Sequence, residues 1–309
     1  MKNVLLLALS VFLSANKSVL TKMIKSENES FLQTMKKNIL AFFIGFLILL
    51  CLGASHLQTA ASAPFLLSFL YAFFTLLAQV AFAVSVSIGP CSISTLFYSC
   101  GFIIPTLWGS LYYQEGLSPI AIAGLVLILA TFVLFTQKDK KMKIRFLWII
   151  TALLGFIGCG LMGVIQKIFI KNNPHLSLQL FLIPAFAFVV ALGALFLAFL
   201  YLFNKKKSSG DKNFPQNKSK ESLKKIAKKN RLSSILFTLF LGVTLGVVHT
   251  VNTHLTGAFP SYITFPVING GMVVATSIFS FLYFKEPLSK KKFFGLFTSI
   301  IGIILLSIG

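Results

Sequence analysis

Hydrophobic residues occupy ten long runs along this chain, and polar residues gather in the stretches between them. Crossing the hydrocarbon core of a bilayer takes about 20 mostly apolar residues in a helix. The composition agrees with a lipid-facing protein: 56% of residues are hydrophobic, 34 are Phe, and only 11% are charged. A soluble domain is nearer a quarter charged. The runs predict ten transmembrane helices, over 4–24, 38–56, 64–86, 91–113, 118–136, 146–167, 178–203, 232–254, 260–284 and 290–308.

The chain contains an internal duplication. Residues 111–125 (LYYQEGLSPIAIAGL) and 282–296 (LYFKEPLSKKKFFGL) are identical at seven of 15 positions. Nearer the front of each half, SVLTK (18–22) matches GVIQK (163–167), so that Lys22 aligns with Lys167. This first segment also resembles a signal peptide, but its place in the repeat favours a transmembrane helix.

The two halves of the duplication each hold five predicted helices. An odd number of spans makes the second copy enter the membrane from the opposite side, which gives inverted repeats. We therefore expect an all-α polytopic membrane protein with repeats at 1–137 and 138–309. The matches lie 145 residues apart at the front and 171 at the back, and the basic, low-complexity stretch 204–231 accounts for the difference. We expect this stretch to be a mobile loop, with a short basic helix on the membrane surface as an alternative.

The formal net charge of +21 is an orientation signal rather than a nucleic-acid footprint. Of 28 Lys and Arg residues, 24 lie in the odd-numbered loops, including eleven in 205–231. Alternate loops share one face of the membrane, and the face with the Lys and Arg excess is cytoplasmic. The count predicts that both termini lie outside a plasma membrane. We expect contacts with membrane lipids and none with nucleic acid.

Two sequence motifs identify a family. The motif E-x-L-S precedes the last predicted helix of each half, with a Gly six residues after the Ser, and FPVINGG occupies 265–271. In these features the chain resembles the drug/metabolite transporter superfamily, specifically its EamA-like branch. The resemblance implies ten helices in two five-helix repeats and a transport function without a cofactor. Members of that superfamily are often drawn with both ends in the cytoplasm, so the charge count of this chain departs from the pattern.

Several motifs have structural explanations. Ser118 before Pro119 is typical of a helix N-cap followed by Pro at the first helical position, and Ser289 repeats the cap. For the neighbouring Glu115 and Glu286 a structural role in these turns is the favoured interpretation. Gly158, Gly160 and Gly163 form G-x-G-x-x-G, but inside an apolar run these residues favour close helix packing over nucleotide binding. The sequence has no Walker motif, which argues against an ATP-driven pump.

The predicted spans that contain Pro and Gly are candidates for the substrate site. Span 260–284 contains Pro266 and the sequence Asn269-Gly270-Gly271, and its counterpart 91–113 contains Gly101 and Pro105. Interrupted helices in matching positions of two halves are typical of a transporter binding site. Simple packing kinks are the alternative. Asn269, about nine residues into its span, is our first candidate for substrate contact.

Further candidates are polar residues inside other predicted spans. His249 and Asn252 lie three residues apart on one helix face, with His254 nearer the end of the helix. Hydrogen bonding between helices is an equally good explanation for each of them. The first half adds Asn16, Lys17, Gln79 and Tyr98 as weaker candidates.

The distribution of acidic residues bears on the substrate. None of the seven acidic residues lies deep in a predicted span, so organic cations are disfavoured. We predict a secondary transporter that exports a small neutral, zwitterionic or anionic metabolite resembling an amino acid, as a monomer or homodimer. His249 or His254 would serve any proton coupling. A non-transporting subunit or regulator of another membrane complex is the alternative. A membrane-embedded enzyme is disfavoured, because the sequence shows no acid–base pair deep in a span and no metal cluster.

Overall fold

The computed structural model describes residues 1–24, 31–53, 63–88, 94, 97–135, 146–208, 220–284 and 290–308. These residues form helices and turns, with no strand among them. The helices are α1 (Lys2–Ile24), α2 (Phe31–Gly53), α3 (Phe65–Ile88), a 3-10 turn η2 (Cys100–Phe102), α5 (Ile103–Tyr112), α6 (Pro119–Phe135), α7 (Phe146–Asn172), α8 (Leu178–Ser208), α9 (Lys220–Ala258), α10 (Ser261–Phe284) and α11 (Lys290–Ile308).

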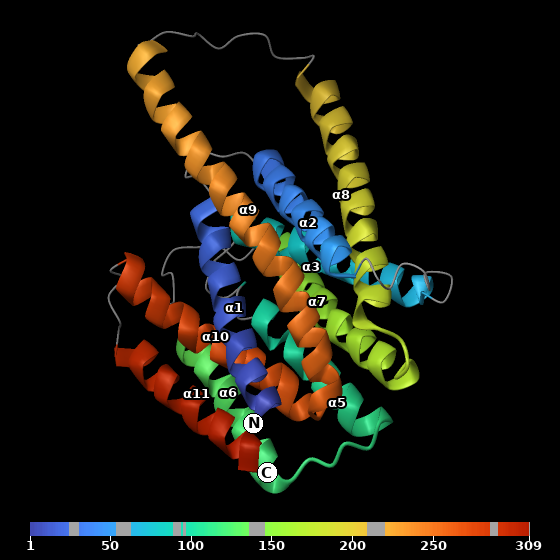
Figure 1. Ribbon diagram of the computed structural model, residues 1–309. Helices are drawn as coiled ribbons and strands as arrows, with labels where there is room; N and C mark the ends of the chain where they lie inside the picture. Colours follow the sequence, from blue (N-terminus) through green and yellow to red (C-terminus); the bar gives the residue numbers. More distant parts are fainter. Residues whose placement is uncertain are drawn as a thin grey trace.

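The helices form a bundle with both chain ends at the same end of the molecule (Figure 1). The extended ends of α8 and α9 project at the opposite end. The helix pairs that pack closely are α3 with α7 and α8, α2 with α8 and α9, α1 with α9 and α10, α5 with α7 and α10, and α6 with α11.

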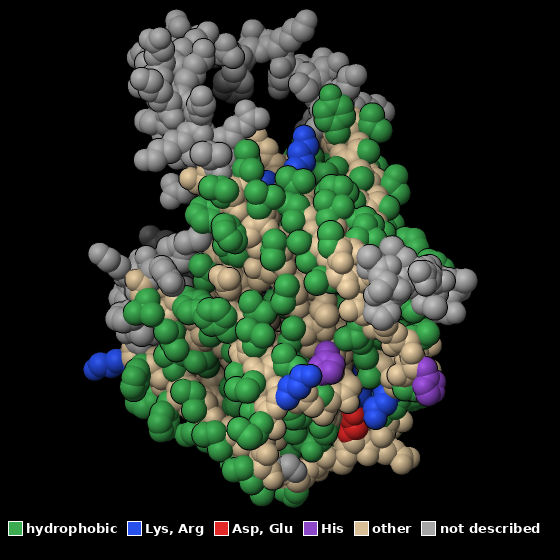
Figure 2. Space-filling view, in the orientation of Figure 1, with side chains coloured by type: hydrophobic (Ala, Val, Ile, Leu, Met, Phe, Trp, Pro, Cys, Tyr) green, Lys and Arg blue, Asp and Glu red, His purple; other side chains and the backbone are tan. Residues whose placement is uncertain are grey.

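The outer surface of the bundle suits a lipid environment. In the described part of the chain, seven helices are long and apolar enough to cross a membrane, and 119–134 and 293–308 are shorter apolar helices. Large hydrophobic side chains such as Leu66 (72% exposed) and Phe240 (63% exposed) face outward. Figure 2 shows one face covered mainly by hydrophobic side chains, with few charged ones. The chain is therefore a polytopic membrane protein that is helical in the described residues.

The two spans in which we expected interruptions differ from each other. In the described part of span 91–113 the helix tightens into η2 just before α5. Pro105 explains this locally, because it has no N–H to donate to the carbonyl of Gly101. By contrast, α10 continues without a break past Pro266 and through Gly270 and Gly271.

The expected mobile loop over 204–231 is largely helical where it is described. Residues 204–208 extend α8, and 220–231 belong to α9, while 209–219 lie outside the described residues. The sequence KESLKKIAKKNR is rich in good helix formers and places Glu221 four residues before Lys225. A short basic helix was the alternative that the sequence left open for this stretch, and the described part is helical. The basic segment continues the axis of α9, as Figure 1 shows, and does not form a separate surface helix.

Glycines let the helices approach closely, as we predicted for the G-x-G-x-x-G segment. A Cβ added at Gly158 of α7 would lie 2.9 Å from the backbone nitrogen of Ala78 in α3. At Gly242 of α9 it would lie 2.8 Å from the carbonyl oxygen of Ala41 in α2. Since a backbone atom cannot rotate away, these two contacts fix the spacing of their helices.

We predict that Gly158→Ala destabilises the protein by about 1–3 kcal/mol through overpacking. Gly155→Ala is the matched control on the same helix, because its added Cβ would meet the nearest atom at 3.7 Å, an ordinary contact. Thermal unfolding of both variants in detergent is the measurement. Equal midpoints for the two variants would contradict the close contact between α3 and α7.

Candidate functional site

A buried polar network joins three helices in the core of the bundle. Gln166 of α7 donates from Nε2 to the hydroxyl oxygens of Tyr71 (3.1 Å) and Thr253 (2.9 Å), on α3 and α9. The Tyr71 hydroxyl lies 2.5 Å from Nδ1 of His249. Because Tyr71 accepts from Gln166, its own proton is free to go to Nδ1, which fits a neutral imidazole. We call Tyr71, Gln166, His249 and Thr253 the polar centre.

The polar centre is enclosed by aromatic side chains. Tyr71 and Thr253 are 0% exposed, and His249 is 6% exposed. The ring of Phe186 meets His249 edge-on at 5.3 Å between centroids, and Phe42 lies at 6.4 Å. In such surroundings an unpaired polar group costs several kcal/mol, so the hydrogen bonds of the centre help to fix α3, α7 and α9 together.

Two of the predicted substrate contacts are already hydrogen-bonded within the protein. Asn252 accepts a hydrogen bond through Oδ1 from the buried Ser10 of α1. Asn269 donates through Nδ2 to the carbonyl of Phe265, one turn earlier in α10 (2.8 Å). For Asn252, as for His249, the contact is the interhelical bond that the sequence left open as the alternative.

The remaining predicted contacts are all partly buried. The side chains of Asn16 and Gln79 make no hydrogen bond to any residue that the structure describes. The ring of Tyr98 packs on Phe82 at 4.9 Å between centroids, and its hydroxyl lies beside the thiol of Cys159. Lys17 lies within electrostatic range of Cys159 and His249. The structure thus brings Lys17 and Tyr98 toward Cys159 and Lys17 toward His249, while Asn269 donates a hydrogen bond within its own helix.

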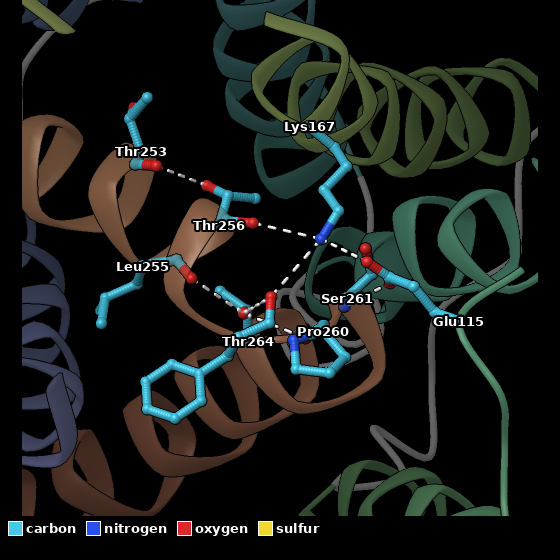
Figure 3. Close-up of polar contacts among 9 residues, drawn as sticks. Glu115, Lys167, Thr253, Leu255, Thr256, Pro260, Ser261 and Thr264 are labelled. Atoms are coloured by element: carbon cyan, nitrogen blue, oxygen red, sulfur yellow. Dashed lines mark hydrogen bonds and ion pairs between the residues drawn. The ribbon is translucent and has the colours of Figure 1, made fainter. Parts of the chain in front are cut away.

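A second polar feature lies nearer the end of the bundle, where Lys167 of α7 pairs with Glu115 of the α5–α6 loop (Figure 3). Nζ of Lys167 lies 2.5 Å from Oε1 of Glu115, and the two side chains are 2% and 10% exposed. Nζ also donates to the carbonyls of Thr256 (3.1 Å) and Phe259 (3.4 Å). All three ammonium protons therefore have acceptors. We call this pair the Lys167–Glu115 clasp.

The clasp contacts the turn between α9 and α10 on both sides: Lys167 contacts the end of α9, and Glu115 contacts the start of α10. Lys167 places its charge at the carboxyl end of α9, where carbonyls lack intrahelical partners. Glu115 accepts through Oε2 from the amide of Ser261, the first residue of α10, at 2.7 Å. Burial opposes ionisation of the Glu115 carboxyl, but the hydrogen bonds from Lys167 and Ser261 and the Lys167 charge outweigh it, so the pKa of Glu115 lies below its ordinary value.

Local backbone geometry directs Glu115 inward. Gln114 adopts the left-handed conformation (φ 53°) just after α5, and the amide of Glu115 turns back to the carbonyl of Gly109 (3.2 Å). On the other side of the loop, the Ser118 hydroxyl accepts from the amide of Ala121 (3.0 Å), and α6 begins at Pro119. This is the N-cap predicted from the sequence; Glu286 and Ser289 lie outside the described residues.

Sequence reasoning missed the partner of Glu115. We gave Glu115 a structural role in its turn and used Lys167 only to align the two halves of the repeat. A signal was present, because both belong to duplicated positions: Lys167 aligns with Lys22, and Glu115 aligns with Glu286. Charged residues repeated at matching places of both halves, inside or at the edge of apolar runs, are candidates for partners of one another.

The described residues include no group of His, Cys, Asp and Glu placed to hold a metal ion.

A model of the EamA-like transporter family matches residues 146–308, more than half of the chain. The chain belongs to the EamA-like transporter family. The expectation drawn from the E-x-L-S and FPVINGG motifs is confirmed, and this EamA-like protein belongs to a family of transporters rather than of enzymes.

The fold of this EamA-like protein also occurs among solved structures. A crystal structure whose title says only "Crystal structure of protein" matches with a TM-score of 0.74 and 12% sequence identity. The match covers 99% of this chain and 96% of the other. At this identity the likeness concerns the fold alone. No curated protein matches the chain in sequence.

We predict that removing either partner of the Lys167–Glu115 clasp costs about 3–5 kcal/mol of stability, because a buried charge is left unpaired. Glu115→Gln and Lys167→Met are the single variants, and thermal unfolding in detergent is the measurement. The double variant should be more stable than the sum of the two losses implies.

Lys171→Met is the control for the clasp experiment. Lys171 lies on the same helix but is exposed, with Nζ 5.8 Å from the centroid of the Tyr113 ring. We expect a loss below about 1 kcal/mol for this variant, as for an exposed charge. Strictly additive losses for Glu115 and Lys167 would show that the two side chains do not interact.

Proposed function

We propose that this EamA-like protein is a secondary transporter that moves a small neutral, zwitterionic or anionic metabolite across the plasma membrane by alternating access. The observation that carries the proposal is the polar centre, which lies between helices of both halves of the chain. Tyr71 comes from the first half, whereas Gln166, His249 and Thr253 come from the second. A polar region at the junction of two repeats is where secondary transporters bind their substrates.

The pairing of helices supports two inverted five-helix repeats. Exchanging the halves turns α1, α2, α3, α5 and α6 into α7, α8, α9, α10 and α11. Under this exchange the α3–α7 pair becomes α9–α1, the α3–α8 pair becomes α9–α2, and the α5–α7 pair becomes α10–α1; all six pairs pack together. The pairs α2–α8, α5–α10 and α6–α11 map onto themselves and also pack together. Such packing is expected of two copies related by a two-fold axis in the membrane plane.

Alternating access requires contacts between the halves that form and break. The Lys167–Glu115 clasp is such a contact, since Glu115 belongs to the first half and Lys167 with the α9–α10 turn to the second. It closes one end of the bundle, and substrate would enter or leave at that end only when the clasp opens. With the orientation given by the positive-inside rule, this end faces outward.

The proposed substrate class follows from the charges in the bundle. In the part of the chain that the structure describes, Glu115 is the one acidic residue that enters the bundle, and it is paired with Lys167. A cationic substrate would therefore meet no free carboxylate there. Export of an amino acid or a similar product is the leading case, by analogy with the family.

We predict that proteoliposomes containing the purified protein release or exchange at least one amino acid from an equimolar mixture, saturably and in a protein-dependent way. His249→Leu should lower this exchange about tenfold or more, because it removes a polar group between the halves. Phe240→Leu, on the lipid-facing side of the same helix, should leave exchange unchanged. Mass spectrometry of the released mixture is the measurement. No exchange of any component by the wild type would favour the non-transporting subunit instead.

We further predict that both termini lie outside the cell. A reporter that is active only in the cytoplasm should be inactive when fused after Gly309 and active when inserted within 208–220. The physical reason is the excess of Lys and Arg in the odd-numbered loops. The reverse pattern of reporter activity would overturn this orientation and leave the fold unchanged.

A further inference from the structure

Lys17 lies on the face of α1 that is directed into the bundle. Ser10, Ser14 and Lys17 follow one another at spacings of four and three residues, which places them on one side of a helix. Ser10 is 0% exposed and donates to Asn252 of α9, and Ser14 is 3% exposed. This face of α1 therefore lies against α9, and Lys17 extends the same stripe by one turn.

The described titratable neighbours of the Lys17 ammonium are a thiol and an imidazole. The ammonium lies within electrostatic range of the Cys159 thiol on α7 and of the His249 ring on α9. Its Nζ makes no hydrogen bond and no ion pair with any residue that the structure describes. The side chain as a whole is partly buried.

Lys167, whose role is structural, provides a comparison for the surroundings of Lys17. Its ammonium has a carboxylate and two carbonyls as acceptors, and its side chain is 2% exposed. Among the residues that the structure describes, Lys17 has none of these partners. An ammonium without a partner in a region of low dielectric gains more from an added anion than it would in water.

We propose that Lys17 holds the anionic group of the substrate, and that this group is a carboxylate. The proposal rests on the transport function proposed above and narrows its substrate class from neutral, zwitterionic or anionic to carboxylate-bearing solutes. The Lys17 ammonium donates to the carboxylate, while the neutral thiol and imidazole beside it leave the anion without a competing negative charge. Amines and amides that lack a carboxylate gain nothing from this contact.

A transport experiment tests the proposed substrate class. Proteoliposomes are loaded with a mixture of matched pairs, each an amino acid or oxo acid and its amide, and the released species are identified by mass spectrometry. We expect protein-dependent release of carboxylates only, lowered about tenfold or more by Lys17→Gln and partly retained by Lys17→Arg. Lys171→Gln removes an exposed charge on α7 and should behave as the wild type. Release of amides at the same rate, or full activity of Lys17→Gln, would overturn the proposal.

A binding experiment separates this proposal from the transport function on which it rests. A variant in which the other cysteines are replaced, so that only Cys159 remains, is labelled with a maleimide. The rate of labelling is compared in the presence of benzoate and of benzamide. We expect benzoate, but not benzamide, to slow the labelling of Cys159, and Lys17→Gln to abolish the difference. If benzoate protects in this way while the wild type transports nothing, the anion site stands and the transporter assignment fails. Equal labelling in benzoate and benzamide would refute the anion site directly.

Discussion

The absence of water from the bilayer core is the constraint on which the rest of this structure depends. A backbone or side-chain polar group that lacks a partner there costs several kcal/mol, so helices satisfy the backbone and short-range bonds satisfy many hydroxyls. Thr244 and Thr250, for example, each donate to the carbonyl four residues earlier. Polar residues that cannot be satisfied within their own helix need partners on another one. The polar centre and the Lys167–Glu115 clasp are the two main places where they find such partners.

These two features have different physical consequences. The polar centre consists of neutral groups and joins α3, α7 and α9 through bonds that each contribute about 1 kcal/mol net. The clasp is a charged pair, and its separation would leave a buried charge. In the proposed alternating-access cycle, the bonds of the polar centre hold the middle of the bundle together. The clasp opens in that cycle only when the binding of a solute or a new partner offsets the separation of charges.

Local features of the fold could be predicted from the sequence because their causes lie within a few residues. The Ser118 cap, the start of α6 at Pro119 and the tightening before Pro105 are of this kind. The close glycine contact of Gly158 was also predictable, since small residues inside an apolar run have few other uses. The family followed from short motifs repeated in each half.

Features that depend on contacts between distant residues could not be predicted in the same way. Glu115 and Lys167 are 52 positions apart, and the residues next to each of them do not indicate that the two side chains pair. The amide of Asn269 could bond outward or to its own helix, and the choice of Phe265 depends on the unbroken geometry of α10. For residues 220–231 the sequence left a mobile loop and a short basic helix as alternatives, and continuity with an apolar helix decides between them.

The length of α9 has a mechanical consequence. At about 1.5 Å per residue its 39 residues span about 58 Å, nearly twice the roughly 30 Å of hydrocarbon. The helix carries part of the polar centre in its inner half, next to α1 and α2, and reaches well beyond the bundle at its basic end (Figure 1). A lever of this shape converts a tilt of a few degrees near His249 into a displacement of several ångströms at Lys220. In the proposed transport cycle, the basic end of α9 would thus move far more than the residues around the polar centre.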